Sequence, residues 1–163
     1  MTEQQQRLTV FRQAYEQHGQ MVYHICLNYL KNHADAEDAV QEVFLRLCCQ
    51  TGIEDEPHRQ HWLIRTAVNY CKDQVKSFWH KRVDLTEVDR TGYSALIEPE
   101  EYGLLAALFQ LPEKQRICLY LFYVQEFTIG EIAAVLRIKQ SSVKMRLKRG
   151  REALRLRQEG ETT

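Results

Sequence analysis

Apolar residues recur at steps of three and four along most of this 163-residue chain, and this spacing restricts the possible folds more than any other feature. Between residues 8 and 30 they come in neighbouring pairs: Val10 and Phe11, Ala14 and Tyr15, Met21 and Val22, Ile25 and Cys26, and Tyr29 and Leu30. An α-helix places such residues on one face, so the pattern predicts a helix with a single buried stripe. Similar stripes predict helices over about 35–47 and 60–80.

The helical pattern stops in the middle of the chain and then resumes. Residues 83–100 are acidic, contain Gly92 and Pro99, and have no sustained period, which predicts a flexible linker. The chain has only 3 Pro and 7 Gly, so a β fold with many tight turns is disfavoured. The predicted fold class is therefore all-α, with two small helical domains, residues 1–82 and 101–163, joined by the linker.

The charges of the chain are separated into blocks, although 22 basic and 22 acidic residues make it neutral overall. Residues 58–82 and 137–157 carry net charges of +5 and +8, whereas residues 32–56 and 83–113 each carry −6. A single block of this kind is typical of a solvated helix face. Two strong basic blocks on helices indicate a polyanion that contacts the chain at two places.

Several classes of protein are disfavoured by what the sequence lacks. No apolar run approaches the roughly 18–20 residues of a membrane span, and the N-terminus has no signal-like apolar core, so we expect a cytoplasmic protein without membrane insertion. Cys26, Cys71 and Cys118 fall at apolar helix positions and are expected to be reduced. Without a third ligand beside His58 and His61, and without a nucleophile–base pair, we predict no metal, no cofactor and no enzyme.

The stretch TIGEIAAVLRIKQSSVKMRLKRGREALRLR, residues 128–157, predicts a helix-turn-helix. Thr128 and Glu131 fit a capping box at the start of a short helix. The chain then turns, and Ser141 or Ser142 can cap a longer helix that carries most of the positive charge. An ordinary helical hairpin with a basic outer face is the other interpretation of this stretch.

One position of this motif departs from its usual pattern. Ala133 is the small residue expected where the two helices approach, and the turn normally places Gly four residues later. Here that position is Arg137. Either Arg137 adopts a left-handed conformation, at a cost of about 1–2 kcal/mol, or the turn has another shape.

Three stretches in this order resemble the extracytoplasmic-function (ECF) sigma factors, the small two-domain initiation subunits of bacterial RNA polymerase. DAEDAVQEVFLRL (35–47) is similar to the family's polymerase-binding helix, and HWLIRTAVNYCKDQVKS (61–77) to the helix that recognises the −10 promoter element. Residues 111–154, which contain the helix-turn-helix, are similar to the domain that recognises the −35 element. The resemblance covers nearly the whole chain.

The resemblance implies core RNA polymerase as a partner, through the clamp helices of its β′ subunit and through its β subunit. Asp35, Asp38, Gln41 and Glu42 match positions that face the clamp helices. Asp35 can instead serve only as a helix cap. The family also implies an antagonist, an anti-sigma factor that masks these surfaces.

Promoter DNA is the second implied partner, and two sets of residues match positions that contact it. The −10 set is Arg65, Asn69, Lys76, Trp79, Lys81 and Arg82. The −35 set is Arg116, Ser141, Ser142, Lys144, Met145, Arg146, Lys148 and Arg149.

Within these sets, Asn69 is expected to contact an exposed base and Arg116 a phosphate. Trp79 either stacks on a base or fills the core. The acidic loop 51–59 occupies the place where the family captures an unpaired base, and whether it contacts DNA stays open.

The function predicted from the sequence is that of an ECF sigma factor, which directs core polymerase to promoters and promotes initiation without catalysis of its own. The alternative is a helix-turn-helix regulator with a helical sensory domain. That alternative accounts for the C-terminal half but leaves residues 35–47 and the first basic block without a role. Nothing beyond unassigned Cys and His residues supports a small helical enzyme.

Overall fold

The computed structural model of the chain describes residues 2–50, 53, 55–81 and 107–161. Every regular element among these residues is a helix, which confirms the predicted all-α class. The chain divides into two compact units, Met1–Asp89 and Arg90–Thr163. The predicted linker 83–100 lies outside the described residues, so its limits stay predictions.

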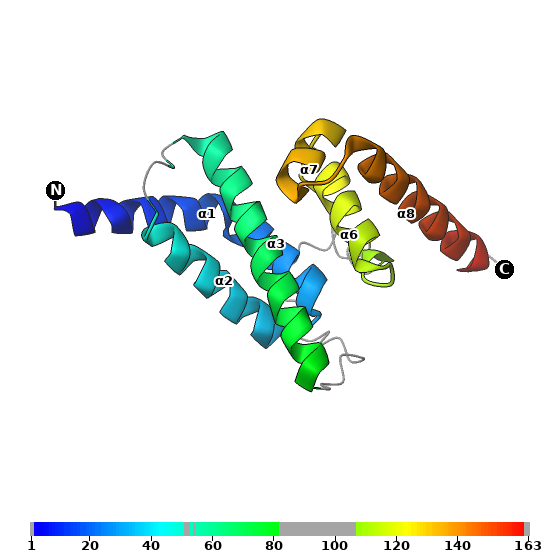
Figure 1. Cartoon of the computed structure of the whole chain (residues 1–163), viewed down its shortest axis with the longest axis horizontal. Coiled ribbons are helices and arrows are strands. Elements are labelled where there is room, and N and C mark those ends of the chain that lie inside the picture. Colours follow the sequence, from blue (N-terminus) through cyan, green and yellow to red (C-terminus); the bar gives the residue numbers. More distant parts are fainter. Residues whose placement is uncertain (1, 51–52, 54, 82–106, 162–163) are drawn as a thin grey trace. The chain divides into compact units, whose positions relative to one another are not determined.

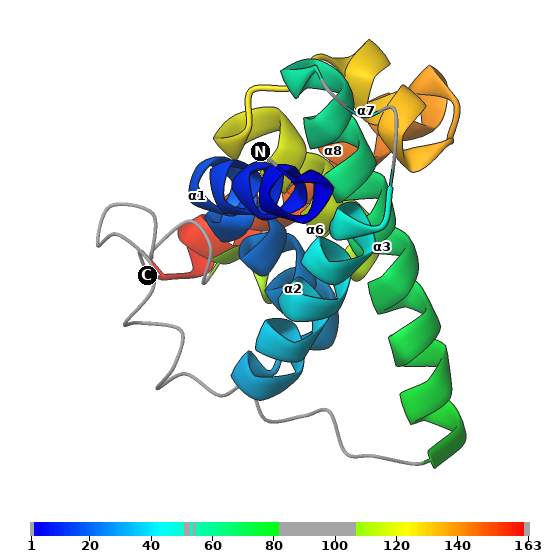
Figure 2. The same cartoon turned by 90° about the vertical axis from the view of Figure 1, so that its left-hand side faces the viewer.

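Three helices form the N-terminal unit: α1 (Glu3–Leu30), α2 (His33–Cys48) and α3 (Glu56–Lys81). Each of them packs against the other two. Figure 1 shows α2 and α3 running beside one another while α1 crosses them. Figure 2 looks along α1 from its N-terminal end and shows α2 and α3 on different sides of it.

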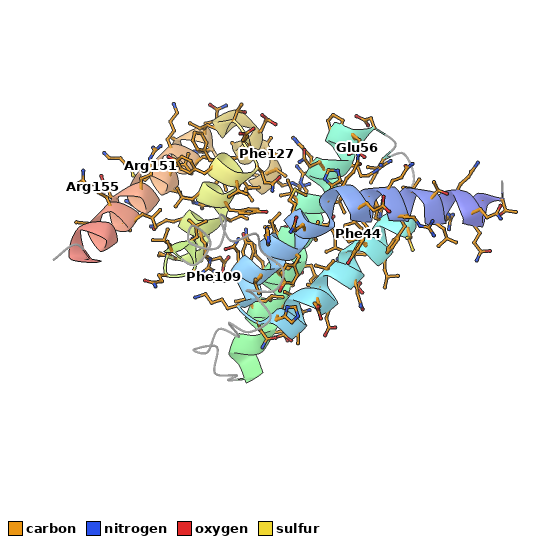
Figure 3. All side chains as sticks on the ribbon, turned by 180° about the vertical axis from the view of Figure 1, so that it is seen from behind. Phe44, Glu56, Phe109, Phe127, Arg151 and Arg155 are labelled. Carbon is orange, nitrogen blue, oxygen red and sulfur yellow. The ribbon has the colours of Figure 1, made fainter. Side chains whose placement is uncertain are left out.

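Most residues of the apolar stripes predicted from the sequence form the core of this unit, but Tyr15 is 52% exposed. Phe44 of α2 is fully buried, and its ring lies 5.9 Å from the ring of Phe11 and 5.3 Å from that of Tyr15, both on α1 (Figure 3). Edge-to-face aromatic pairs of this kind stabilise a core beyond the area that they bury. Cys26 and Cys71 are buried free thiols, as expected.

The starts of α1 and α2 differ from the predictions. α1 begins at Glu3 rather than near residue 8, because Thr2 and Gln5 form a capping box in which the Thr2 hydroxyl accepts from the Gln5 amide at 3.2 Å. α2 is capped by Asn32, whose side-chain oxygen accepts from the Asp35 amide at 2.9 Å. The interpretation of Asp35 as the cap is therefore wrong, since its side chain lies inside the first turn.

The start of α3 is fixed by a charged cluster around Glu56. The Glu56 carboxylate accepts from His18 Nε2 of α1 at 2.7 Å and from Arg59 Nη1 at 2.7 Å (Figure 3). Arg59 is only 6% exposed, whereas the Glu56 side chain is 41% exposed, so the arginine is removed from water and the carboxylate is partly solvated. α3 thus begins within the predicted loop 51–59, and Glu56 is occupied by protein partners.

The C-terminal unit contains α6 (Glu113–Leu119), a π-helix η1 (Tyr120–Val124), α7 (Ile129–Leu136) and α8 (Gln140–Glu161). α8 packs on both α6 and α7. The π-helix continues α6 directly, and it ends with a bond from the Gln125 amide to the Tyr120 carbonyl at 3.2 Å. The apolar spacing of these residues predicts a helix, but it does not distinguish an α-helix from the wider turn of a π-helix.

A glycine permits the close approach of α8 to α6. Gly150 is buried, and a Cβ atom at this position would lie 2.5 Å from Cδ1 of Leu119. Real Cβ atoms do not approach another carbon so closely, so a larger residue would require the buried Leu119 side chain or one of the two helices to shift. Val143 and Leu147 of α8 are buried on the same side.

The helix-turn-helix has the predicted cap and a left-handed turn. Thr128 and Glu131 form the capping box, with the Thr128 hydroxyl accepting from the Glu131 amide at 3.1 Å. Arg137 has φ 58° and ψ 47°, and its amide donates to the Ala133 carbonyl. Of the two alternatives for this turn, the structure therefore contains the left-handed one. α8 begins at Gln140, so neither Ser141 nor Ser142 is its cap; both lie in its first turn.

We predict that Arg137→Gly stabilises the C-terminal unit by about 0.5–1 kcal/mol. Glycine removes the left-handed strain, and part of the gain is offset because glycine also gives the unfolded chain more freedom. Denaturant unfolding of the two proteins measures the difference. Arg137→Ala keeps the strain and should give no gain; an equal gain from alanine would show that the charge, not the backbone, is responsible.

Candidate nucleic-acid interface

The buried side of α8 determines which of its residues face outward. Val143, Leu147 and Gly150 are buried. Ser141 and Met145 lie on the opposite side, because successive residues are about 100° apart around a helix. Lys144 and Lys148 lie next to them on one side of the helix, and all four are exposed. The structure thus brings half of the predicted −35 set together on one outward face.

Two more residues of the −35 set lie on the other side of Met145 around the helix. Arg146 and Arg149 line a pocket together with the start of α6, which contributes Pro112, Glu113, Lys114 and Gln115. Three cations and one acid, Glu113, therefore line this pocket at the first turn of α6, where the Gln115 amide is already bonded to the Pro112 carbonyl. A phosphate fits such a place, since backbone amides and fixed cations both favour a negative group.

Arg116 is not available to DNA, which corrects the prediction of a phosphate contact. Its side chain is 2% exposed. The guanidinium donates to the carbonyl oxygens of Phe109 at 3.3 Å and Leu111 at 3.1 Å, and it lies over the Phe109 ring. Arg116 therefore binds the backbone just before α6, where carbonyl groups need partners.

Three residues of the −10 set lie on one face of α3. Arg65, Asn69 and Lys76 recur at spacings of four and seven, opposite the buried stripe of Leu63, Ile64, Ala67, Val68 and Cys71. Asn69 and Lys76 are exposed, and Arg65 is half-buried. The side chains of Trp79 and Lys81, and all of Arg82, lie outside the described residues, so their roles stay predictions.

Two further residues lie on this face of α3 and were missed. The apolar pattern over 60–80 predicts that Trp62 belongs to the buried stripe. In the structure Trp62 is half-exposed, and it precedes Arg65 by three residues and Asn69 by seven. Lys72 is exposed three residues after Asn69. The spacing from Asn69 is the signal that could have identified both.

The polymerase-binding set lies on α2. Asp38 and Gln41 are exposed, whereas Asp35 and Glu42 are half-buried. Burial, and then the nearby carboxylate of Asp38, raise the pKa of Asp35. Leu45 was not among the predicted residues. It lies on the same face of α2 and is 58% exposed. Its spacing of four from Gln41 and three from Glu42 is the signal that could have identified it.

The faces of α2 and α3 meet at Tyr70. The guanidinium of Arg46 lies 5.2 Å from the centre of the Tyr70 ring, and its Nε donates to Glu42 at 3.1 Å. Burial first, and then the charge of Glu42, raise the pKa of Tyr70. Tyr70 follows Asn69 directly, so this contact connects the acidic face of α2 to the basic face of α3.

Other kinds of site are not found in the part of the chain that the structure covers. Within residues 2–50, 53, 55–81 and 107–161, no three His, Cys, Asp or Glu side chains are placed to hold a metal ion. None of the described helices is long and apolar enough to cross a bilayer.

A helix-turn-helix with a cationic outer face defines a class of DNA-binding proteins, and two family matches specify the class further. Residues 14–81 match Sigma-70 region 2, and residues 103–154 match Sigma-70, region 4. These matches include α2 and α3 in the first region, and α6 to α8 up to residue 154 in the second.

Individual relatives agree with these matches. The ECF RNA polymerase sigma factor SigW of Bacillus subtilis is 32% identical over 152 residues, covering 82% of this chain and 81% of SigW. SigE of Mycolicibacterium smegmatis is 30% identical, covering 85% of this chain and 58% of SigE. The chain therefore belongs to the ECF sigma factors of the sigma-70 family, which are DNA-binding transcription initiation factors.

Solved structures agree in fold. The sigma factor RpoE of Bartonella quintana, solved in complex with the anti-sigma factor NepR, superposes with a TM-score of 0.71 at 20% identity and covers 88% of this chain and 93% of its own. CnrH, solved with the cytosolic domain of CnrY, gives a TM-score of 0.66 at 21% identity, covering 97% of this chain and 96% of its own.

We predict that Arg116→Ala destabilises the C-terminal unit by about 2–4 kcal/mol, because it removes two charge-assisted hydrogen bonds and leaves a cavity. Arg149→Ala, at an exposed position, should change stability by less than about 0.5 kcal/mol. Thermal or denaturant unfolding measures both. If Arg116→Ala leaves the stability unchanged, the structural role of Arg116 is contradicted, and Arg116 is again a candidate for a DNA contact.

Proposed function

We propose that this sigma factor uses three helical faces for three tasks: α2 binds core polymerase, α3 binds the opened −10 element, and α8 recognises the −35 element. One observation supports this most directly. On α2, α3 and α8, most of the described candidate residues lie away from the buried stripe, where a partner can reach them. Because core polymerase works on the chromosome, the proposed place of action is the cytoplasm.

At the −35 element, the two sets of cations on the C-terminal unit have different roles. Lys144, Met145 and Lys148 face bases in the major groove, which is wide enough to admit an α-helix. Arg146, Arg149 and Lys114 hold phosphates beside the groove and fix the orientation of α8. Arg146 thus contributes affinity more than sequence preference.

At the −10 element, α3 stabilises unpaired bases of one strand. The Asn69 amide can donate to a base edge and accept from it, and the half-exposed Trp62 offers a ring on which a base can stack. Arg65, Lys72 and Lys76 attract the backbone. Binding of this kind shifts the equilibrium between closed and open DNA, and it breaks no covalent bond; catalysis then belongs to the polymerase.

The interface with polymerase is proposed to have an apolar centre and an acidic rim. Leu45 is exposed beside Gln41 and Glu42, and Asp38 lies one turn further toward the start of α2. Interfaces commonly have this arrangement, in which a few apolar anchors supply most of the binding energy. The acidic rim also discourages binding of this face to DNA.

We further propose an anti-sigma factor as a regulatory partner. The sigma factor RpoE of Bartonella quintana, which shares this fold, was solved in complex with the anti-sigma factor NepR, and CnrH with the cytosolic domain of CnrY. An antagonist that covers Leu45 and the acidic residues of α2 would exclude polymerase by direct competition.

Transcription in vitro tests the proposed function. The purified chain is added to sigma-free bacterial core polymerase, and the 5′ ends of RNA made from genomic DNA are sequenced. Discrete start sites that share two upstream elements are expected. Failure to bind core polymerase of the same host would favour a helix-turn-helix regulator instead.

We predict that Leu45→Ala weakens binding to core polymerase by about 1–2 kcal/mol, roughly 5- to 30-fold, as for an apolar anchor at the centre of an interface. Fluorescence anisotropy of the labelled chain with core polymerase measures the affinity. Leu8→Ala is the matched control, since Leu8 is 61% exposed on α1 of the same unit. Equal effects of the two substitutions would contradict a specific role for Leu45.

We predict that Asn69→Ala leaves core binding unchanged and reduces promoter opening about tenfold or more, because a base loses its hydrogen-bond partner. A fluorescent base analogue within the −10 element reports unpairing. The exposed Ser77, on the same helix, supplies the control Ser77→Ala. Normal opening by Asn69→Ala would exclude the proposed contact.

A further inference from the structure

We infer, on the basis of the proposed role of α8 at the −35 element, that Met145 recognises the methyl group of a thymine in that element. Met145 would then determine one base of the promoter preference of this particular chain. The flanking cations would contribute hydrogen bonds and charge.

The position of Met145 follows from the packing of α8. Val143, Leu147 and Gly150 are buried against the rest of the unit. With about 100° per residue, Met145 lies roughly 140–160° around the helix from each of them. Its side chain therefore points almost directly away from the core. In a helix inserted into the major groove, such a residue meets the floor of the groove first.

The surroundings of Met145 distinguish it from an ordinary exposed apolar residue. Its side chain is 47% exposed, whereas Leu147, two residues later, is 1% exposed. Exposed cations lie on either side of it around the helix, Lys148 on one side and Arg149 on the other. Single apolar residues on a surface are common and need no explanation. An apolar residue at the centre of a basic face, in the first two turns of a recognition helix, does suggest an apolar group on the partner.

The chemistry of the major groove offers a single apolar group among the four standard bases. Every base pair presents hydrogen-bond donors or acceptors there, and thymine alone adds a methyl group. Methionine cannot donate a hydrogen bond, and its sulfur accepts only weakly. Its long unbranched side chain adapts to a small apolar target. Lysine is a poor partner for the methyl group, so Lys144 and Lys148 do not compete for it.

The test uses the holoenzyme, reconstituted from sigma-free core polymerase and the full chain. Promoter duplexes are first selected from random DNA, and footprinting locates the −35 element. Each thymine of that element is then replaced by uracil, which removes only the methyl group and keeps every hydrogen-bonding group. One replacement should weaken binding about three- to fivefold, the effect expected for losing one buried methyl contact.

Two variants and a control complete the design. With Met145→Ala, the same replacement of thymine by uracil should have no further effect. With Met145→Gln, renewed selection should change the preference at that position toward adenine, since glutamine can bond to both N6 and N7 of adenine. Leu156→Ala removes another exposed apolar side chain of α8, 63% exposed, and should retain the full methyl effect.

Contrary results separate this inference from the proposed function. If the −35 element is selected and protected but no replacement weakens binding, or if Met145→Ala remains equally sensitive to it, the assignment of Met145 is wrong while the role of α8 stands. If no −35 element is selected or protected, the proposed role of α8 fails, and the assignment of Met145 fails with it.

Discussion

The packing of α8 against α6 is the contact on which the DNA-binding end of this protein depends. Gly150 allows the two helices to approach so closely that a Cβ atom would meet Leu119 at 2.5 Å. With Val143 and Leu147 also buried, α8 has one possible rotation about its own axis. That rotation places Met145, Lys144 and Lys148 outward, and it brings Arg146 and Arg149 beside the start of α6. One apolar contact thus determines the directions in which neighbouring cations point.

Charge on this chain serves the fold as well as its partners. Arg116 binds two backbone carbonyls and Arg59 pairs with Glu56, and both arginines are nearly inaccessible to water. Arg151 of α8 donates to the hydroxyl of Tyr123 at 3.2 Å, although Figure 3 shows it on the outer side of the helix. The number of basic residues in a block therefore overestimates the positive charge that is accessible to DNA. The cations left for partners are those whose side chains reach the surface.

The sequence was informative where a local pattern determines the outcome. Apolar spacing predicted the helices, and the capping box at Thr128 and Glu131 formed as expected, because both depend on residues close together in the chain. Arg116 was misassigned because its partners, the carbonyls of Phe109 and Leu111, become available only when the preceding turn folds back. Trp62 was assigned to the core because an aromatic residue next to Leu63 fits a buried stripe, and the linear sequence does not show whether such a residue is buried or exposed at the edge of the stripe.

The sequence alone determined the helical class, the order of the segments, the family resemblance and the helices that carry the candidate sites. These features follow from periodicity and local caps, which a linear pattern contains. Only the tertiary structure decided which side chains remain available to partners: Leu45 and Met145 outward, Arg116 inward, and Glu56 held by His18 and Arg59. The physical reason is that exposure depends on how each helix rotates to bury its stripe. That rotation is set by contacts between helices distant in the sequence.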